Sequence, residues 1–242
     1  MRTLFTLFAA FMLMGNTIKE QAWALMEEGK EAEAFALVKD GAKEKDAESI
    51  DYLAWFYDQG RHVERDMKRA EKLYREAAEL GVPHAQWRLG VLIDEGAAKG
   101  SKEDAFALFQ QAAGQNFSNA MTSLAVMYAT GRGTAQDHEA AKFYYSMAAA
   151  AGNPHAVQGL GVLYILGEGV EKDPVEAAAY FLLASSLGSE SGEANFRRSR
   201  ADLSAEDLAR ATARASELGS QFGFEGSVTI EKPERRNILQ KR

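Results

Sequence analysis

The residues best suited to acid–base or metal chemistry are four histidines: His62, His84, His138 and His155. Histidine titrates near neutral pH and is a common zinc ligand. No two of the four have the spacing of a paired ligand set. His84 and His155 each follow a proline at the same place in two similar segments, so internal symmetry accounts for them. We therefore predict no metal site and no cofactor.

Other catalytic motifs are also missing from the sequence. The 242 residues include no cysteine, which excludes thiolate nucleophiles and cysteine-held zinc or iron–sulfur sites. No serine lies in a nucleophile-elbow motif. The glycine-rich turns GRG (131–133) and GEGVEKD (167–173) are not followed by a phosphate-binding pattern. The sequence predicts a protein that is not an enzyme.

These glycine-rich turns belong to a segment that occurs four times. Its closing glycines are 36, 35 and 36 residues apart, and glycine accepts the left-handed conformation that ends a helix. The first helix of each copy reads SIDYLAWFYDQG (49–60), AQWRLGVLIDEG (85–96), AMTSLAVMYATG (120–131) or AVQGLGVLYILG (156–167). The second helix reads MKRAEKLYREAAELG (67–81), KEDAFALFQQAAGQN (102–116), HEAAKFYYSMAAAAG (138–152) or PVEAAAYFLLASSLG (174–188).

Two repeated features predict how these hairpins pack. A small residue in the first helix lets a neighbouring helix approach closely; these residues are Ala54, Gly90, Ala125 and Gly161. An aromatic residue in the second helix fills the space between layers; these residues are Tyr74, Phe109, Tyr145 and Phe181. One hairpin cannot bury its apolar face alone, whereas stacked hairpins bury each other's. The prediction is an all-α fold, a right-handed α-solenoid of four helix-turn-helix repeats of about 36 residues plus terminal capping helices.

The third and fourth copies best carry the pattern Ala-x-x-x-Leu-Gly-x-x-Tyr-x-x-Gly-x-Gly, followed by an alanine and aromatic helix that ends in Ala-Ala-x-x-Gly. This pattern resembles the Sel-one-like repeat (SLR), a longer-turned relative of the tetratricopeptide repeat, over residues 48–189. The turns GRHVERD and GAAKGSKED of the first two copies lack the second turn glycine at its usual place, two residues after the first. The resemblance implies a protein-binding adaptor of signalling or envelope complexes, although some cysteine-rich members are associated with β-lactam binding or hydrolysis.

The ends of the chain differ from the repeats. Arg2 and the apolar run 4–14 are typical of a secretory signal peptide and too short to span a bilayer comfortably. An apolar helix capping the repeats is the alternative. The predicted segments are a signal peptide or apolar helix (1–18), an N-terminal capping helix pair (19–46), four repeats (47–189), C-terminal capping helices (190–219) and a mobile basic tail (220–242).

Binding is predicted on the concave face, where the first helices of such repeats lie. The recurring positions between consensus residues are Asp51, Trp55, Asp58, Trp87, Val91, Asp94, Thr122, Val126, Gln158 and Val162. Trp55 and Trp87 are the expected anchors, because large aromatic residues often dominate interface energy. The alternative is that both tryptophans pack between layers.

The expected partner is a protein or peptide. A net charge of −7 argues against a general nucleic-acid binder, and no integral membrane span is expected. The sequence predicts a non-catalytic scaffold in the bacterial cell envelope, periplasmic or secreted if the leader is cleaved and cytoplasmic otherwise. Two alternatives stay open, namely a secreted effector acting on host proteins and a β-lactam-binding or β-lactam-hydrolysing enzyme. The oligomeric state is not predicted.

Overall fold

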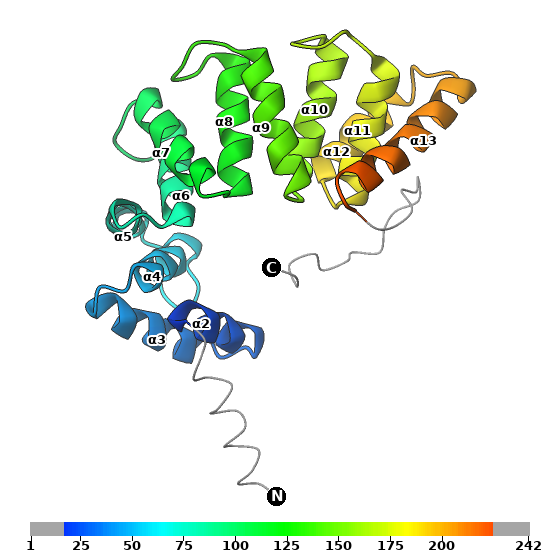
Figure 1. Ribbon diagram of the computed structural model, residues 1–242. Coiled ribbons are helices and arrows are strands. Elements are labelled where there is room, and N and C mark those ends of the chain that lie inside the picture. The colour runs from blue at the N-terminus through cyan, green and yellow to red at the C-terminus, as the bar shows by residue number, and fades with distance from the viewer. Residues whose placement is uncertain (1–16, 225–242) are drawn as a thin grey trace, which may run out of the picture. The chain divides into compact units, whose positions relative to one another are not determined.

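The computed structural model describes residues 17–224, and every regular element within this range is an α-helix (Figure 1). The predicted leader and tail fall largely in residues 1–16 and 225–242, outside the described range. The helices are α2 (Ile18–Glu27), α3 (Glu31–Lys43), α4 (Ala47–Gln59), α5 (Met67–Glu79), α6 (Pro83–Asp94), α7 (Lys102–Gly114), α8 (Ser118–Thr130), α9 (His138–Ala150), α10 (Pro154–Leu166), α11 (Pro174–Ser186), α12 (Glu190–Ser199) and α13 (Ala205–Gln221).

The chain divides into two compact units, Met1–Ala112 (unit one) and Ala113–Arg242 (unit two). In unit one, α2 pairs with α3 and α4 with α5, and α5 then packs on α6. In unit two, α8 pairs with α9 and α10 with α11, and α9 packs on α10. Each unit therefore stacks helical hairpins in chain order, which confirms the predicted all-α solenoid architecture. No helix between residues 17 and 224 is long and apolar enough to cross a membrane.

The closing glycines end their helices as predicted. Gly60, Gly131 and Gly167 are the C-caps of α4, α8 and α10, with φ of 64°, 69° and 77°. Most side chains at such a positive φ strain the backbone, so glycine is favoured there. Asn116, at the place where the second copy has no glycine, adopts φ 62°, which asparagine tolerates better than most residues.

The small and aromatic repeat positions pack together, which explains their recurrence. All four aromatic wedges are buried. A Cβ added at Gly90 would lie 2.6 Å from a ring carbon of Phe109, and one added at Gly161 would lie 2.6 Å from a ring carbon of Phe181. These glycines therefore make room for the aromatic ring of the paired helix.

The C-terminal helices cover α11 more completely than any other second helix is covered. Both α12 and α13 pack along α11, and its residues 177–184 are all buried. Arg214 of α13 forms a bidentate ion pair with Glu176 of α11. The Arg214 Nε donates to Glu176 Oε2 at 2.9 Å, and the Arg214 Nη2 donates to Glu176 Oε1 at 3.1 Å. The hydrogen bond to Glu176 raises the pKa of Arg214, so the guanidinium stays charged and joins α13 to α11.

Candidate binding surfaces

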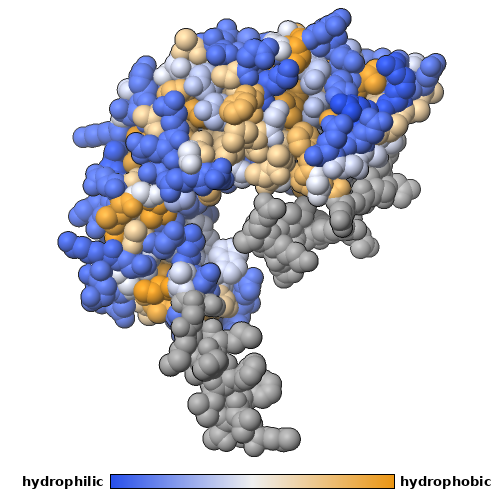
Figure 2. All heavy atoms as spheres, viewed as in Figure 1, coloured by the Kyte–Doolittle hydropathy of each residue, from blue (hydrophilic) through white to orange (hydrophobic). Residues whose placement is uncertain are grey.

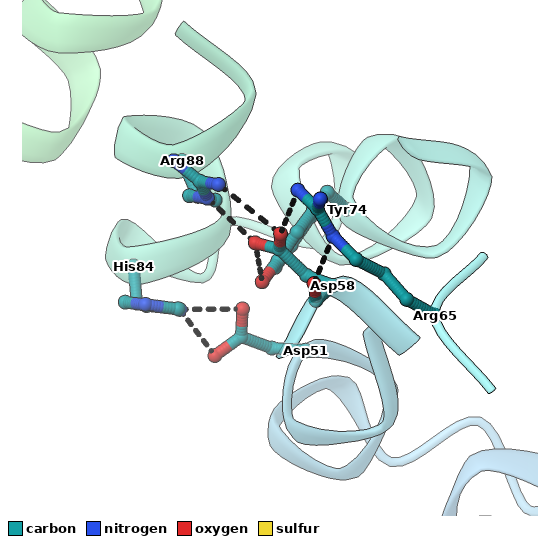
Figure 3. Close-up of polar contacts among 6 residues, drawn as sticks. All are labelled: Asp51, Asp58, Arg65, Tyr74, His84 and Arg88. Atoms are coloured by element: carbon teal, nitrogen blue, oxygen red, sulfur yellow. Dashed lines mark hydrogen bonds and ion pairs between the residues drawn. The ribbon is translucent and has the colours of Figure 1, made fainter. Parts of the chain in front are cut away.

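Asp58, a predicted binding residue, lies inside unit one at the junction of α4, α5 and α6 (Figure 3). Its carboxylate accepts hydrogen bonds from Arg88 Nε at 2.7 Å and from the Tyr74 hydroxyl at 3.2 Å. Arg65 donates from Nε to the Asp58 backbone carbonyl at 2.8 Å and approaches the carboxylate at 4.0 Å. Because Asp58 is 2 % exposed, these donors replace the water that a buried carboxylate would lose.

The protonation states of Tyr74 and Arg88 suit a structural role in which both donate hydrogen bonds to Asp58. Burial, and then the charge of Asp58, raise the pKa of Tyr74, so its hydroxyl remains a donor. The hydrogen bond to Asp58 raises the pKa of Arg88, which stays charged. With a fixed cation and a fixed hydroxyl on one carboxylate, the arrangement joins α4 to α5 and α6.

Asp51, also a predicted binding residue, is buried beside the Asp58 cluster and pairs with His84 of α6. The His84 Nδ1 lies 2.8 Å and 3.0 Å from the two Asp51 carboxylate oxygens (Figure 3). His155 occupies the same repeat position as His84 but is exposed, because the residue 33 positions before it is Thr122 instead of an aspartate. Symmetry between the repeats therefore explains where these histidines lie, and the partner in the preceding helix decides what they do.

The two predicted anchors, Trp55 and Trp87, are both half-buried. Trp55 packs on the N-terminal core, with its ring 5.4 Å from those of Tyr52 and Phe56. The Trp87 ring lies 5.8 Å from the His84 ring. Each indole thus combines an interior contact with some exposed surface.

The remaining predicted positions are half-buried as well; they are Val91, Asp94, Thr122, Val126, Gln158 and Val162. Asp94 pairs with Lys102, whose Nζ is 3.1 Å from its Oδ1. Gln158 accepts a hydrogen bond from Ser191 of α12 at 2.7 Å. The structure brings Asp51, Asp58 and Trp87 into one region of unit one and places the last four positions on α8 and α10 of unit two.

The polar partners His84, Arg88 and Tyr74 were absent from the predicted site. Their sequence signal is an aspartate in one first helix followed 30 or 33 residues later by a basic residue. This spacing identifies a pair only once the rotation between successive hairpins is known. Within residues 17–224 no group of three or more histidine, aspartate or glutamate side chains is placed to hold a metal ion.

Alkaline pH should destabilise unit one through Tyr52. Burial raises the pKa of Tyr52 to about 12, and its hydroxyl has no hydrogen-bond partner among residues 17–224. An unfolded tyrosine titrates near about 10, so its stabilising contribution is complete below that pH and is lost as the pH rises towards 12. Between pH 8 and pH 11 the loss should be about 1.4 kcal/mol per such tyrosine.

The measurement is urea unfolding followed by tryptophan fluorescence at the two pH values. Tyr52→Phe should be as stable as the parent at pH 8 and should lose about 1.4 kcal/mol less on going to pH 11. An identical pH response in both proteins would contradict the assignment.

Comparison with known proteins gives a consistent family and fold. The Sel1 repeat family model matches four consecutive segments, residues 47–82, 83–117, 118–153 and 154–189. This match confirms the resemblance drawn from the repeated glycine, alanine and aromatic positions. Among curated proteins, no sequence matches the chain.

Solved structures with similar folds come from several bacteria. A protective antigen of uropathogenic Escherichia coli with an SLR fold superimposes with a TM-score of 0.76 at 24 % identity; the match covers 95 % of this chain and 53 % of that protein, so the chain spans about half of that relative's length. A Sel1 repeat protein from Oxalobacter formigenes superimposes with a TM-score of 0.68 at 24 % identity, and the match covers 84 % of each chain. An immunity protein from Pseudomonas aeruginosa superimposes with a TM-score of 0.51 at 21 % identity, and the match covers 78 % of this chain and 75 % of that protein. At these identities the likeness shows a shared fold.

Proposed function

The chain belongs to the Sel1 repeat family, and from this premise we propose that it is a non-catalytic scaffold that binds a protein or peptide partner. Repeats of this family are typically protein-interaction modules. The proposed contact surface is the row of first-helix positions in unit two, Thr122 and Val126 on α8 and Gln158 and Val162 on α10. We further propose that the partner is in the cell envelope, because the sequence before residue 17 is typical of a secretory signal.

The observation that carries the proposal is the register between successive hairpins of unit two. Asn153 Nδ2 donates to Asn119 Oδ1 at 2.8 Å, and Ser191 donates to Gln158 at 2.7 Å, in each case from one hairpin to the preceding one. These bonds align equivalent positions of neighbouring repeats. A segment running across the helices would meet one polar and one apolar side chain per repeat, which supports recognition of a sequence by spacing.

Among the predicted binding residues of unit one, the tryptophans are available to a partner and the two buried aspartates are not. Asp51 and Asp58 are engaged by His84, Arg88 and Tyr74, so their carboxylates serve the fold. Trp55 and Trp87 keep part of their indole surface exposed. Any anchoring by unit one is therefore expected to be aromatic.

Site-specific photocrosslinking tests the proposed row. A benzoylphenylalanine at Val126 or Gln158 should give the same single adduct in cells, and the same residue at the exposed Ala213 of α13 should not. The captured protein, once purified, should bind the parent chain and lose at least tenfold in affinity for Val126→Asp.

Two outcomes would overturn the proposal. Adducts of equal yield at Ala213 would mean that the row has no special contact. Turnover of a β-lactam by the purified chain, abolished by one substitution, would favour the enzymatic alternative.

A further inference from the structure

The outer face of α9 carries two large apolar side chains in contact with solvent. Phe143 and Met147 lie one turn apart on one face of the helix and are 58 % and 37 % exposed. Figure 2 shows apolar residues gathered over the part of unit two that α9 occupies in Figure 1. These residues lie on a second helix, away from the first-helix row proposed above.

Comparison between the four repeats shows that this face is unusual. The equivalent pair is Lys72 and Glu76 in α5 and Ala107 and Gln111 in α7, all exposed and either polar or small. In α11 the pair is Ala179 and Leu183, both buried. The α9 pair is therefore the one large apolar pair that stays uncovered among the second helices of residues 47–189.

The chain itself shows how such a face is covered. Helix α13 packs along α11, whereas the successive second helices α9 and α11 make no comparable contact. The buried residues of α13 are Ala211, Ala215, Leu218 and Gly219, which are spaced as one stripe of a helix. A helix with small residues thus lies on the outer face of a second helix and forms an outer layer on unit two.

This outer layer has an edge beside α9. A Cβ added at Gly152, just after the end of α9, would lie 3.9 Å from a ring carbon of Phe224, three residues beyond the end of α13. The chain that follows α13 therefore reaches the end of α9. A further helix on the α9 face would extend the layer that α13 begins.

We propose that the outer face of α9 is a docking site for an amphipathic helix of a partner protein, bound as α13 is bound to α11. The docking face of that helix has alanine, serine or glycine four residues apart, because Phe143 and Met147 already fill the space between the helices. Ala140 of α9 replaces the residue equivalent to Glu176, so the partner helix needs no counterpart of Arg214. This site is independent of the first-helix row.

The test uses a synthetic peptide of residues 204–222, capped at both ends and fluorescently labelled, as a helix with the required face. Its binding to the full chain is measured by fluorescence anisotropy. We expect saturable binding that weakens at least tenfold for Phe143→Glu and for Met147→Lys in the protein, and equally for Ala211→Glu in the peptide. Glu76→Lys, at the same repeat position in α5, is the matched control and should bind as the parent does.

Circular dichroism of each variant shows whether it is folded, which an exposed position should allow. Absence of binding, or equal binding by Phe143→Glu, would overturn the proposal. Self-association of the chain that Phe143→Glu abolishes would identify a second copy as the occupant instead. Displacement of the probe by a peptide of residues 225–242 would identify the chain's own C-terminal segment, and would likewise overturn a partner helix.

Discussion

Replacing Arg88 with methionine is expected to lower the free energy of unfolding of unit one by about 3–5 kcal/mol. Methionine fills much of the same volume but cannot donate to Asp58, whose side chain is 1 % exposed (Figure 3). The Tyr74 hydroxyl and the distant Arg65 would then be left to solvate a buried negative charge. A buried ion that loses its main partner costs far more than a surface ion pair contributes.

Urea unfolding followed by tryptophan fluorescence measures this effect, because Trp23, Trp55 and Trp87, the three tryptophans of the chain, all lie in unit one. Lys43→Met is the control, since it breaks an ion pair with Asp40 whose side chains are 65 % and 72 % exposed, and it should leave the transition unchanged. The double variant Asp58→Asn with Arg88→Met should regain part of the loss, because it removes the unpaired charge. A double variant no more stable than Arg88→Met would show that lost packing, and not the buried charge, causes the destabilisation.

The repeat positions were predictable because each depends on contacts within one hairpin or between neighbours of known spacing. Gly60, Gly131 and Gly167 adopt the left-handed conformation that their place after an apolar helix indicated. Gly90 and Gly161 face the aromatic rings that their periodicity predicted. Local propensity and packing agree at these positions, so the pattern of residue types carries the fold.

The roles of Asp51 and Asp58 could not be obtained in this way. Both stand at variable positions of a first helix, and a variable position can face solvent or the next hairpin. Which of these holds depends on the rotation between successive hairpins, because a rotation by one helical position, about 100°, moves a side chain from the buried face towards solvent. The pairing of Asp51 with His84 and of Asp58 with Arg88 is visible only once that rotation is known.

The periodicity of the sequence also could not predict which helix covers α11. The sequence predicts capping helices after residue 189, and both α12 and α13 are present. The alanine-rich stripe of α13 indicates a buried face but not the helix that it covers. Helix α13 covers α11, and the ion pair between Arg214 and Glu176, 38 residues apart, joins the two helices. As a result α11 is buried where α9 is exposed.

That contrast between α11 and α9 leads to a second large expected effect, for two phenylalanines of unit two. Phe181→Ala should lower the free energy of opening of the α10–α11 hairpin by about 3–5 kcal/mol. The buried Phe181 ring packs against Gly161, which has no side chain to fill the cavity that the substitution leaves. Phe143→Ala should change the free energy of opening of its own hairpin, α8–α9, by less than about 0.5 kcal/mol, since most of the Phe143 ring is already in solvent. Amide hydrogen exchange of α8 to α11 measures both effects, with Leu166→Ala, another exposed apolar residue, as a further control. Comparable losses for Phe181→Ala and Phe143→Ala would mean that Phe143 supports the fold, and the reason for regarding the α9 face as a docking surface would be removed.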